Sequence, residues 1–283
     1  MGTINPGDEV LLLAPFYPPY LANVQLAGGT PVVVPMNSEE NFNPNPAIIE
    51  DHVTKKTKAL ILHSPNNPAG SVYREEILAQ LVRLAERRDF LIISDEVYEK
   101  FIYGGHPHWS PAAFPNAKER VILTNSFSKT YAMTGWRVGY IAAPRETLLQ
   151  LLKYHHTVNI CANAAAQKAC IAALEGPQDC VLEMVGEYDR RRKHLVERLK
   201  GLPGIQCVPP QGAFYIFADI RDLNLPSLEM AKYLVQEAGV LTANGSGFGT
   251  EGFIRLSYAT KIKQIDEALD RIQKALAKLP GKR

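Results

Sequence analysis

Short, continuous apolar runs alternate with helical stretches through the first half of this chain, and that alternation limits the folds open to it. Six runs are rich in leucine, isoleucine, valine and alanine: 10–14, 31–35, 59–63, 90–94, 121–124 and 137–142. Uninterrupted apolar runs of this length are typical of strands covered on both faces. Between the third and fourth runs, residues 74–88 carry apolar side chains at helical spacing. The repeated strand–helix–strand order predicts an α/β fold, a three-layer, mostly parallel sheet with helices on both sides.

After about residue 144 the pattern becomes mainly helical. Helices are expected over 146–156, 164–174, 180–199, 227–238 and 265–279, and strands over 212–218 and 252–258. These elements predict a smaller α+β unit at the C-terminal end. Because no repeat or low-complexity linker divides the chain, we place the boundary within the long helix. The expected domains are a large one over residues 1–183 and a small one over 184–283.

Charge and composition argue against several classes of protein. The net charge is +2, so no strong field points to nucleic acid or to a membrane surface. The basic run 190–193 has acidic neighbours and is expected to be a solvated helix face. No apolar run approaches the roughly 18 residues of a spanning helix. The first nine residues lack the basic and apolar regions of a signal peptide.

The four cysteines are spaced too widely for a zinc knuckle or a redox pair. They are Cys161, Cys170, Cys180 and Cys207. They are expected to be buried thiols in a reducing compartment, which predicts a cytoplasmic protein. An organelle protein whose transit peptide is not in this chain would have the same composition.

One segment, residues 126–140, combines an amine with groups that suit a phosphate. Lys129 lies within a run of hydroxyls and small residues, and Arg137 follows eight positions later. A lysine amine condenses with carbonyl compounds, of which pyridoxal phosphate is a common one. Hydroxyls and an arginine suit its dianionic phosphate. Asn67, Asp95 and Ser126 each follow a predicted strand, where ligands lie in parallel sheets.

Four motifs extend the pattern along the chain: Ser64-Pro65-Asn66-Asn67-Pro68-Ala69-Gly70, Ser94-Asp95-Glu96-Val97-Tyr98, the 126–140 segment, and Gly252-Phe253-Ile254-Arg255-Leu256-Ser257-Tyr258. Their order and spacing resemble the pyridoxal-phosphate-dependent aminotransferases of fold type I, class I/II, especially the aspartate- and aromatic-type enzymes. The resemblance implies the type I transferase fold, pyridoxal 5'-phosphate as cofactor and a homodimer. It also implies transfer of an amino group from an L-amino acid to a 2-oxo acid.

The resemblance also implies roles for the residues around the cofactor ring. Lys129 would form the Schiff base, and its freed amine would move the proton of the substrate Cα. Asp95 would pair with the protonated pyridine nitrogen, so that the ring can take up electrons. Tyr98 and Asn67 would hydrogen-bond the 3' oxygen, and Asn67 would also lie on the substrate side. Tyr17 would stack on the ring.

The remaining roles concern the two anionic groups. Ser126 and Arg137 would hold the phosphate, with Ser128 as a helper. Arg255 would bind the substrate α-carboxylate through a bidentate fork that lysine cannot copy. No metal ligands are expected, because His155-His156 and His106-Pro107-His108 lack carboxylate or cysteine partners at ligand spacing. The glycine-rich stretch 245–249 does not join a strand to a helix as a nucleotide fingerprint does.

Several of these residues also have a purely structural interpretation. Asp95 could cap a helix, Asn67 could be an ordinary turn residue, Tyr17 could pack in a proline-rich turn, and Arg255 could be a surface arginine at a strand end.

Two alternatives to an aminotransferase remain open from the sequence. A lyase or cyclopropane-forming synthase of the same fold would carry a similar site. A complete family member is also longer by roughly a hundred residues ahead of this chain's first residue. The resemblance places there one sheet strand and a backbone loop for the phosphate. The chain could therefore be an inactive or weakly active derivative, with an open sheet edge beside residues 137–142 and reduced cofactor affinity.

Overall fold

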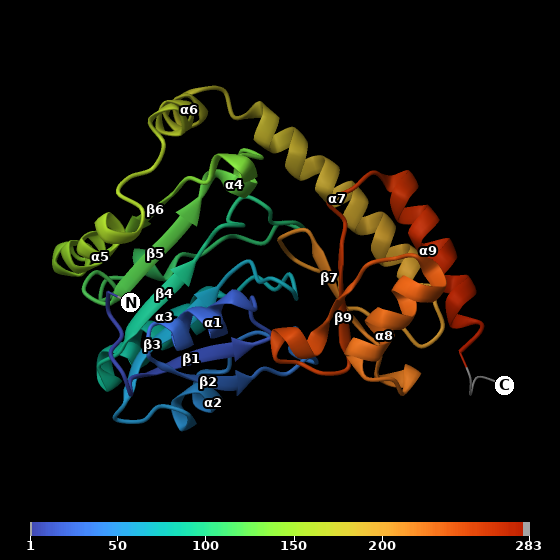
Figure 1. Cartoon of the computed structure of the whole chain (residues 1–283), viewed down its shortest axis with the longest axis horizontal. Coiled ribbons are helices and arrows are strands. Elements are labelled where there is room, and N and C mark those ends of the chain that lie inside the picture. The colour runs from blue at the N-terminus through green and yellow to red at the C-terminus, as the bar shows by residue number, and fades with distance from the viewer. Residues whose placement is uncertain (1, 280–283) are drawn as a thin grey trace.

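The computed structural model describes residues 2–279, and a six-stranded sheet forms the centre of its N-terminal half (Figure 1). Its strands are β1 (Glu9–Ala14), β2 (Thr30–Pro35), β3 (Thr57–His63), β4 (Leu91–Asp95), β5 (Val121–Ser126) and β6 (Gly139–Ala142). Their order across the sheet is β2-β1-β3-β4-β5-β6. Neighbours run parallel except β5 and β6, which are antiparallel. The mostly parallel α/β sheet predicted from the apolar runs is confirmed.

Helices cover both faces of this sheet, and the inner strand β1 carries apolar side chains on both of its faces. Val10, Leu12 and Ala14 form one cluster with Val24 of α1 (Pro19–Leu26), whereas Leu11 and Leu13 belong to the cluster of α3 on the opposite face. Helix α3 (Glu75–Arg88) buries Ile77, Leu78, Leu81, Val82, Leu84 and Ala85, the stripe expected from the sequence. Each large apolar side chain buried this way stabilises the fold by roughly 2 kcal/mol.

Strand β6 differs from the expectation for residues 137–142. The apolar run predicted a strand covered on both faces, but β6 is the edge strand and all four of its residues are exposed. Tyr140 and Ile141 are each about half exposed. The expected open edge is therefore present, with no strand paired to its outer side within residues 2–279. An apolar run indicates a strand but carries no information about its neighbours.

Three helices lead from the large sheet to the small one: α5 (Arg145–Val158), α6 (Ala164–Glu175) and α7 (Asp179–Lys200). Figure 1 shows α7 running from α6 to the C-terminal sheet. On α7, Arg190 and Arg191 pair with Glu187, and Arg192 and Lys193 pair with Asp189. The basic run is thus a charge-paired helix face, as expected. No helix among the described residues is both long and apolar enough to span a membrane.

A three-stranded antiparallel sheet forms the C-terminal half. It contains β7 (Tyr215–Asp219), β8 (Ala243–Asn244) and β9 (Phe253–Ser257) in the order β7-β9-β8. Its core also includes side chains of α7, α8 (Ser227–Tyr233) and α9 (Ile262–Leu276). A π-helical turn, η4 (Leu234–Ala238), continues α8.

Short elements were not predicted from the sequence. These are β8, α1, α2 (Pro46–Asp51), α4 (Phe127–Thr130), and the 3-10 turns η1 (Pro111–Ala113), η2 (Thr134–Trp136), η3 (Arg221–Leu223) and η5 (Gly245–Phe248). Segments of two to eight residues show too little of a 3.6- or 2-residue period to be recognised.

The cysteines do not all lie in the core. Cys170 is buried and Cys207 is half-buried, but Cys161 and Cys180 are exposed. The expectation of four buried thiols is wrong for the latter two. Cys161 lies in the connection between α5 and α6, and Cys180 lies in the first turn of α7, so neither faces a core.

Candidate active site

A cavity of about 500 Å³ brings together every residue that the sequence nominated for cofactor or substrate. Nine of the residues that line it are Tyr17, Asn67, Asp95, Tyr98, Ser126, Ser128, Lys129, Arg137 and Arg255. Eight of them come from strands, a short helix and loops of the N-terminal half, and Arg255 comes from β9 of the small sheet. Residues separated by up to 238 positions thus share one surface.

The cavity lies at the carboxyl ends of parallel strands, where ligands bind in sheets of this kind. Asp95 and Ser126 are the last residues of β4 and β5, and His63 is the last residue of β3. His63 lies opposite Asp95 in the strand register. Asn67 follows β3 in a turn that the Asn66 side chain closes by accepting the Ala69 N–H at 2.9 Å. The strand ends therefore determine the positions of three residues proposed to bind the cofactor: Asn67, Asp95 and Ser126.

Lys129 is the amine of this site. It lies on α4, directly after β5, and its side chain is half-buried with Nζ 5.7 Å from the centre of the Phe214 ring. Burial lowers the pKa of Lys129, and the charges of Arg137 and Arg255 lower it further. A lowered pKa increases the fraction of neutral amine, which is the nucleophilic form.

Hydroxyls and a guanidinium gather beside Lys129. Ser126 caps α4, with its Oγ accepting the Ser128 N–H at 3.1 Å and lying 2.8 Å from Ser128 Oγ. Arg137 is exposed, adopts a left-handed backbone conformation with φ 53°, and donates from Nη1 to the Thr134 carbonyl at 3.0 Å. No acidic side chain pairs with Arg137 among residues 2–279. This end of the cavity can accept a dianion.

Asp95 is the carboxylate of this site, and a tyrosine that the sequence did not nominate holds it. The Tyr20 hydroxyl donates to Asp95 Oδ2 at 2.5 Å, and the Val97 N–H donates to Oδ1 at 3.2 Å. Burial, together with the neighbouring Asp95, raises the pKa of Tyr20 well above its usual value. Tyr20 therefore remains a protonated donor that orients the carboxylate.

Tyr98 presents a buried phenol to the cavity. Its ring stacks on His63 with centroids 5.7 Å apart, and its hydroxyl lies 3.2 Å from the Tyr215 hydroxyl. Burial and the Tyr215 hydroxyl raise its pKa. Tyr98 is thus a neutral hydrogen-bond donor at any physiological pH.

Arg255 is held by aromatic rings and by Asn67. Its guanidinium carbon lies 4.4 Å from the centre of the Tyr215 ring and 5.0 Å from that of Phe248. Nη1 donates to Asn67 Oδ1 at 3.0 Å, whereas the buried Nε has no hydrogen-bond partner in the described chain. Phe248 belongs to the glycine-rich stretch, which places that loop beside Arg255. An arginine without a carboxylate partner retains its capacity to bind one.

The lining or supporting residues that the sequence did not nominate include Tyr20, His63 and Tyr215. Tyr20 lies three residues after Tyr17, in the first turn of α1, and this spacing could have signalled it. His63 and Tyr215 carry no comparable local signal, because their position depends on the way β3 and β7 meet the cavity.

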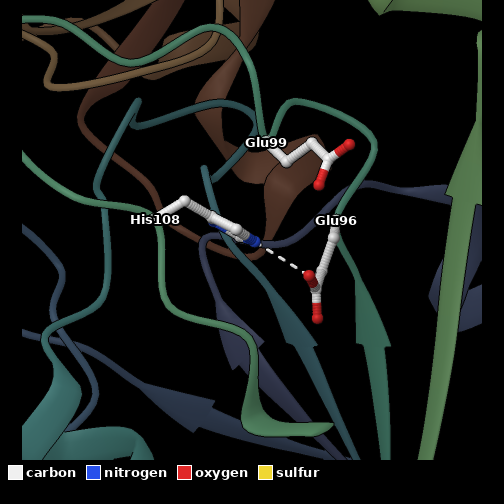
Figure 2. A group of neighbouring side chains, drawn as sticks. All are labelled: Glu96, Glu99 and His108. Atoms are coloured by element: carbon white, nitrogen blue, oxygen red, sulfur yellow. Dashed lines mark hydrogen bonds and ion pairs between the residues drawn. The ribbon is translucent and has the colours of Figure 1, made fainter. Parts of the chain in front are cut away.

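A separate cluster lies beside the site (Figure 2). Glu96, Glu99 and His108 bring their ligand atoms within 4.8 Å of one another. No ligand-like spacing in the sequence pointed to a carboxylate partner for His108, because Glu96 and Glu99 lie 12 and 9 residues earlier in the chain. Glu96 Oε2 lies 2.8 Å from His108 Nε2, and Oε1 accepts from Ser94 and Ser110. Both oxygens of this buried carboxylate are therefore used to tie the 106–113 loop to the end of β4.

The donor set of the cavity fits pyridoxal phosphate. The aldehyde of this cofactor needs an amine, its ring nitrogen needs a carboxylate, and its phosphate needs a cation with hydroxyls. Side chains of all these kinds line the same cavity. The unpartnered Nε of Arg255 leaves a further anion site for a substrate carboxylate.

Comparisons with known proteins agree with this chemistry. Residues 1–272 match the family model for aminotransferase class I and II. The chain is 43% identical to an aspartate aminotransferase of Pyrococcus abyssi and 41% identical to aromatic-amino-acid aminotransferase 2 of Thermococcus litoralis. Each match covers 96% of this chain and 71% of the relative.

Solved structures give the same result for the fold. An aromatic aminotransferase from Pyrococcus horikoshii superposes with a TM-score of 0.95 at 41% identity, over 98% of this chain and 75% of that one. A Thermus thermophilus aspartate aminotransferase with maleate superposes with a TM-score of 0.91 at 37% identity. This match covers 97% of this chain and 71% of that one. This chain therefore belongs to the class I and II aminotransferases, pyridoxal-phosphate-dependent enzymes that transfer an amino group from an amino acid to a 2-oxo acid.

Proposed function

We propose that Lys129 is the catalytic amine of this aminotransferase, with Asp95, Tyr98 and Arg255 as its principal partners. The observation that supports this most strongly is the shared cavity: an amine of lowered pKa lies with a carboxylate and an arginine that has no acidic partner among the described side chains. Amine, carboxylate and arginine are the groups that transamination needs.

When bound, pyridoxal phosphate supplies a carbonyl for Schiff-base formation and a ring that takes up the electrons of the broken Cα–H bond. Lys129 Nζ would hold the cofactor through its carbonyl, and its neutral amine would accept the substrate Cα proton and donate it to the former carbonyl carbon. Asp95, oriented by Tyr20, would pair with the protonated ring nitrogen. Ser126, Ser128 and Arg137 bind the phosphate.

The other two positions orient the reacting groups. The Tyr98 hydroxyl would donate a hydrogen bond to the 3' oxygen, and the Asn67 amide N–H would donate a second one while Asn67 Oδ1 accepts from Arg255. Arg255 binds the substrate α-carboxylate with a bidentate fork. The half-exposed ring of Tyr17 covers one face of the cofactor ring, as the aromatic partner of a stack.

Substrates with an acidic or aromatic side chain are the best candidates for the amino donor. Relatives of this chain are named aspartate, aspartate/prephenate and aromatic-amino-acid aminotransferases. The cavity offers aromatic surface from Tyr17, Tyr98, Tyr215 and His63, together with the cations named above. An amino-acid panel with 2-oxoglutarate as acceptor tests this choice.

We also infer a domain boundary near residue 183, a homodimeric state and a cytoplasmic location. The boundary is supported by α7, whose last turns pack with the small sheet. Exposed apolar residues on α5, such as Leu149, Leu152 and Val158, support self-association. The free thiol state of all four cysteines supports a reducing compartment. Sedimentation of the purified chain tests the dimer.

The decisive experiment compares the wild-type chain with Lys129→Ala. Borohydride reduction of the wild type with pyridoxal phosphate should trap an adduct on Lys129 that mass spectrometry identifies. The variant should form no adduct and lose transamination by orders of magnitude, while its circular dichroism and unfolding midpoint stay near those of the wild type. Lys168→Ala, on the surface of α6, is the matched control. Wild-type turnover in Lys129→Ala would refute the assignment.

A further inference from the structure

Tyr215 contacts two residues of the proposed site, Arg255 and Tyr98. It is the first residue of β7, half-buried, and it lines the same cavity. In the antiparallel register it faces Ser257 of β9, and Arg255 lies two residues earlier on that strand. Diagonal neighbours of this kind lie within reach of a long side chain. The register therefore brings the Tyr215 ring to the Arg255 guanidinium.

The ring of Tyr215 determines how Arg255 is held. The guanidinium carbon lies 4.4 Å from the ring centre, closer than to the Phe248 ring at 5.0 Å. Asn67 accepts a single hydrogen bond, and no salt bridge involves Arg255 in residues 2–279. One hydrogen bond does not fix the plane of a guanidinium, whereas stacking on an aromatic face does. A bidentate carboxylate bond requires that plane to be set in advance.

The hydroxyl of Tyr215 determines how Tyr98 is held. The two phenolic oxygens are 3.2 Å apart, and either one can donate. If Tyr215 donates, the Tyr98 proton is free to point into the cavity, where a phenolate oxygen of the cofactor would accept it. The ring and the hydroxyl of one side chain thus act on two different residues.

We propose that Tyr215 is a positioning residue with two separable effects: its ring sets the guanidinium plane of Arg255, and its hydroxyl directs the Tyr98 proton into the cavity. The inference rests on the proposed function for the roles of Arg255 and Tyr98. It adds a residue that touches neither reacting atom but controls both carboxylate binding and the electronic state of the cofactor.

Two substitutions separate the effects. Tyr215→Leu removes the ring and should raise KM for amino acid and 2-oxo acid about tenfold, with kcat changed less than about threefold, as expected for a lost cation–π contact. Tyr215→Phe keeps the ring and should leave KM within about twofold. It should instead shift the pH midpoint of the visible absorbance of the bound cofactor by up to about one unit, as expected for one lost hydrogen bond.

Two controls bracket these variants. Phe248→Leu removes the other ring near Arg255 and should raise KM without moving the pH midpoint, because Phe248 makes no hydrogen bond to Tyr98. Tyr233→Phe removes a hydroxyl that donates to the Ala275 carbonyl in the small-sheet core, and should change neither quantity.

A readout independent of turnover keeps this inference separate from the proposed function. The dissociation constant of succinate, an unreactive dicarboxylate, can be measured by calorimetry on the cofactor-free chain. It should rise about tenfold in Tyr215→Leu and stay near the wild-type value in Tyr215→Phe. Unchanged succinate binding in Tyr215→Leu, or an unshifted midpoint in Tyr215→Phe, would overturn the corresponding effect. Absence of turnover in the wild type would refute the proposed function instead, and the succinate titration would still decide the effect of the ring.

Discussion

Replacing His63 with phenylalanine should remove part of the acid sensitivity of this fold. His63 is buried at the end of β3, stacked on Tyr98 and edge-on to Tyr20, and neither ring nitrogen has a hydrogen-bond partner among the side chains and backbone described. Burial lowers its pKa from 6.5, and this effect exceeds the opposing attraction of Asp95. The folded chain therefore keeps His63 neutral at pH values where the unfolded chain protonates it.

The sign of the effect follows from the direction of the shift. As the pH falls below 6.5, the unfolded chain binds a proton that the folded chain does not, so the free energy of unfolding decreases. The loss amounts to about 1.4 kcal/mol for each pH unit until the folded-state pKa is reached. Phenylalanine cannot titrate, so His63→Phe should not show this loss.

At about pH 8 the two proteins should differ little. Removing two unpartnered buried nitrogens is favourable by roughly 1–3 kcal/mol. The larger ring costs a similar roughly 1–3 kcal/mol through overpacking. The gain from removing the nitrogens and the cost of overpacking oppose each other at every pH. The pH-dependent loss of stability occurs in the wild type alone.

Urea unfolding of the cofactor-free chain between about pH 8 and pH 5 measures the difference. The curve of His63→Phe should diverge from that of the wild type below pH 6.5, in favour of the variant. His156→Gln, on the exposed face of α5, should follow the wild type and serves as the control. Parallel curves for wild type and His63→Phe over this range would refute the reasoning, because they would mean that His63 titrates alike in both states.

Four further changes test other parts of the structure. Arg255→Lys should raise KM for the amino acid by roughly 10–100-fold, because a charge-assisted hydrogen bond worth roughly 1.5–3 kcal/mol is lost. Steady-state kinetics measures KM, and an unchanged value would contradict the assignment. Glu96→Ala should lower the free energy of unfolding by about 3 kcal/mol, because three hydrogen-bond donors around a buried carboxylate lose their acceptor; urea titration checks this value. Gly70→Ala should destabilise the fold by more than about 1 kcal/mol, because Gly70 has φ +70° and a Cβ there would lie 2.4 Å from Pro210 Cβ. Gly186→Ala in α7, where nothing lies within 4 Å of the added Cβ, should instead stabilise the fold by roughly 1 kcal/mol. Equal changes in the free energy of unfolding for the two glycine substitutions would contradict both predictions.

The regular part of the fold could be predicted because burial there is periodic along the chain. Helix α3 buries the six apolar residues that its helical spacing indicated, and β1 is buried on both faces as its continuous apolar run predicted. Strand β6 has a similar run but lies exposed at the edge of the sheet. Its exposure depends on what lies beside it, and a run of apolar residues contains no information about that.

The residues of the site also fall into a group that the sequence identifies and a group that it does not. Lys129, Asp95 and Asn67 were found because each lies at a strand end within a recognisable motif. Tyr20 and Tyr215 were not found, since their roles arise from hydrogen bonds across 75 and 117 positions of sequence. The residues proposed to carry the chemistry have local signatures, whereas the residues proposed to orient them are defined by the tertiary structure.

The state of Lys129 shows why the local signature is insufficient for activity. Its pKa is lowered by burial, by Arg137 from its own segment, and by Arg255 from β9. The charge of Arg255 acts on Lys129 only when β9 of the small sheet packs against the large one, and Phe214, whose ring centre lies 5.7 Å from Nζ, directly precedes β7 of the same small sheet. A peptide with the 126–140 sequence would therefore lack the effect of Arg255 and keep only that of Arg137. The reactivity of the amine is a property of the junction between the two sheets, so substitutions that loosen that junction should reduce the fraction of neutral amine even where every motif residue is retained.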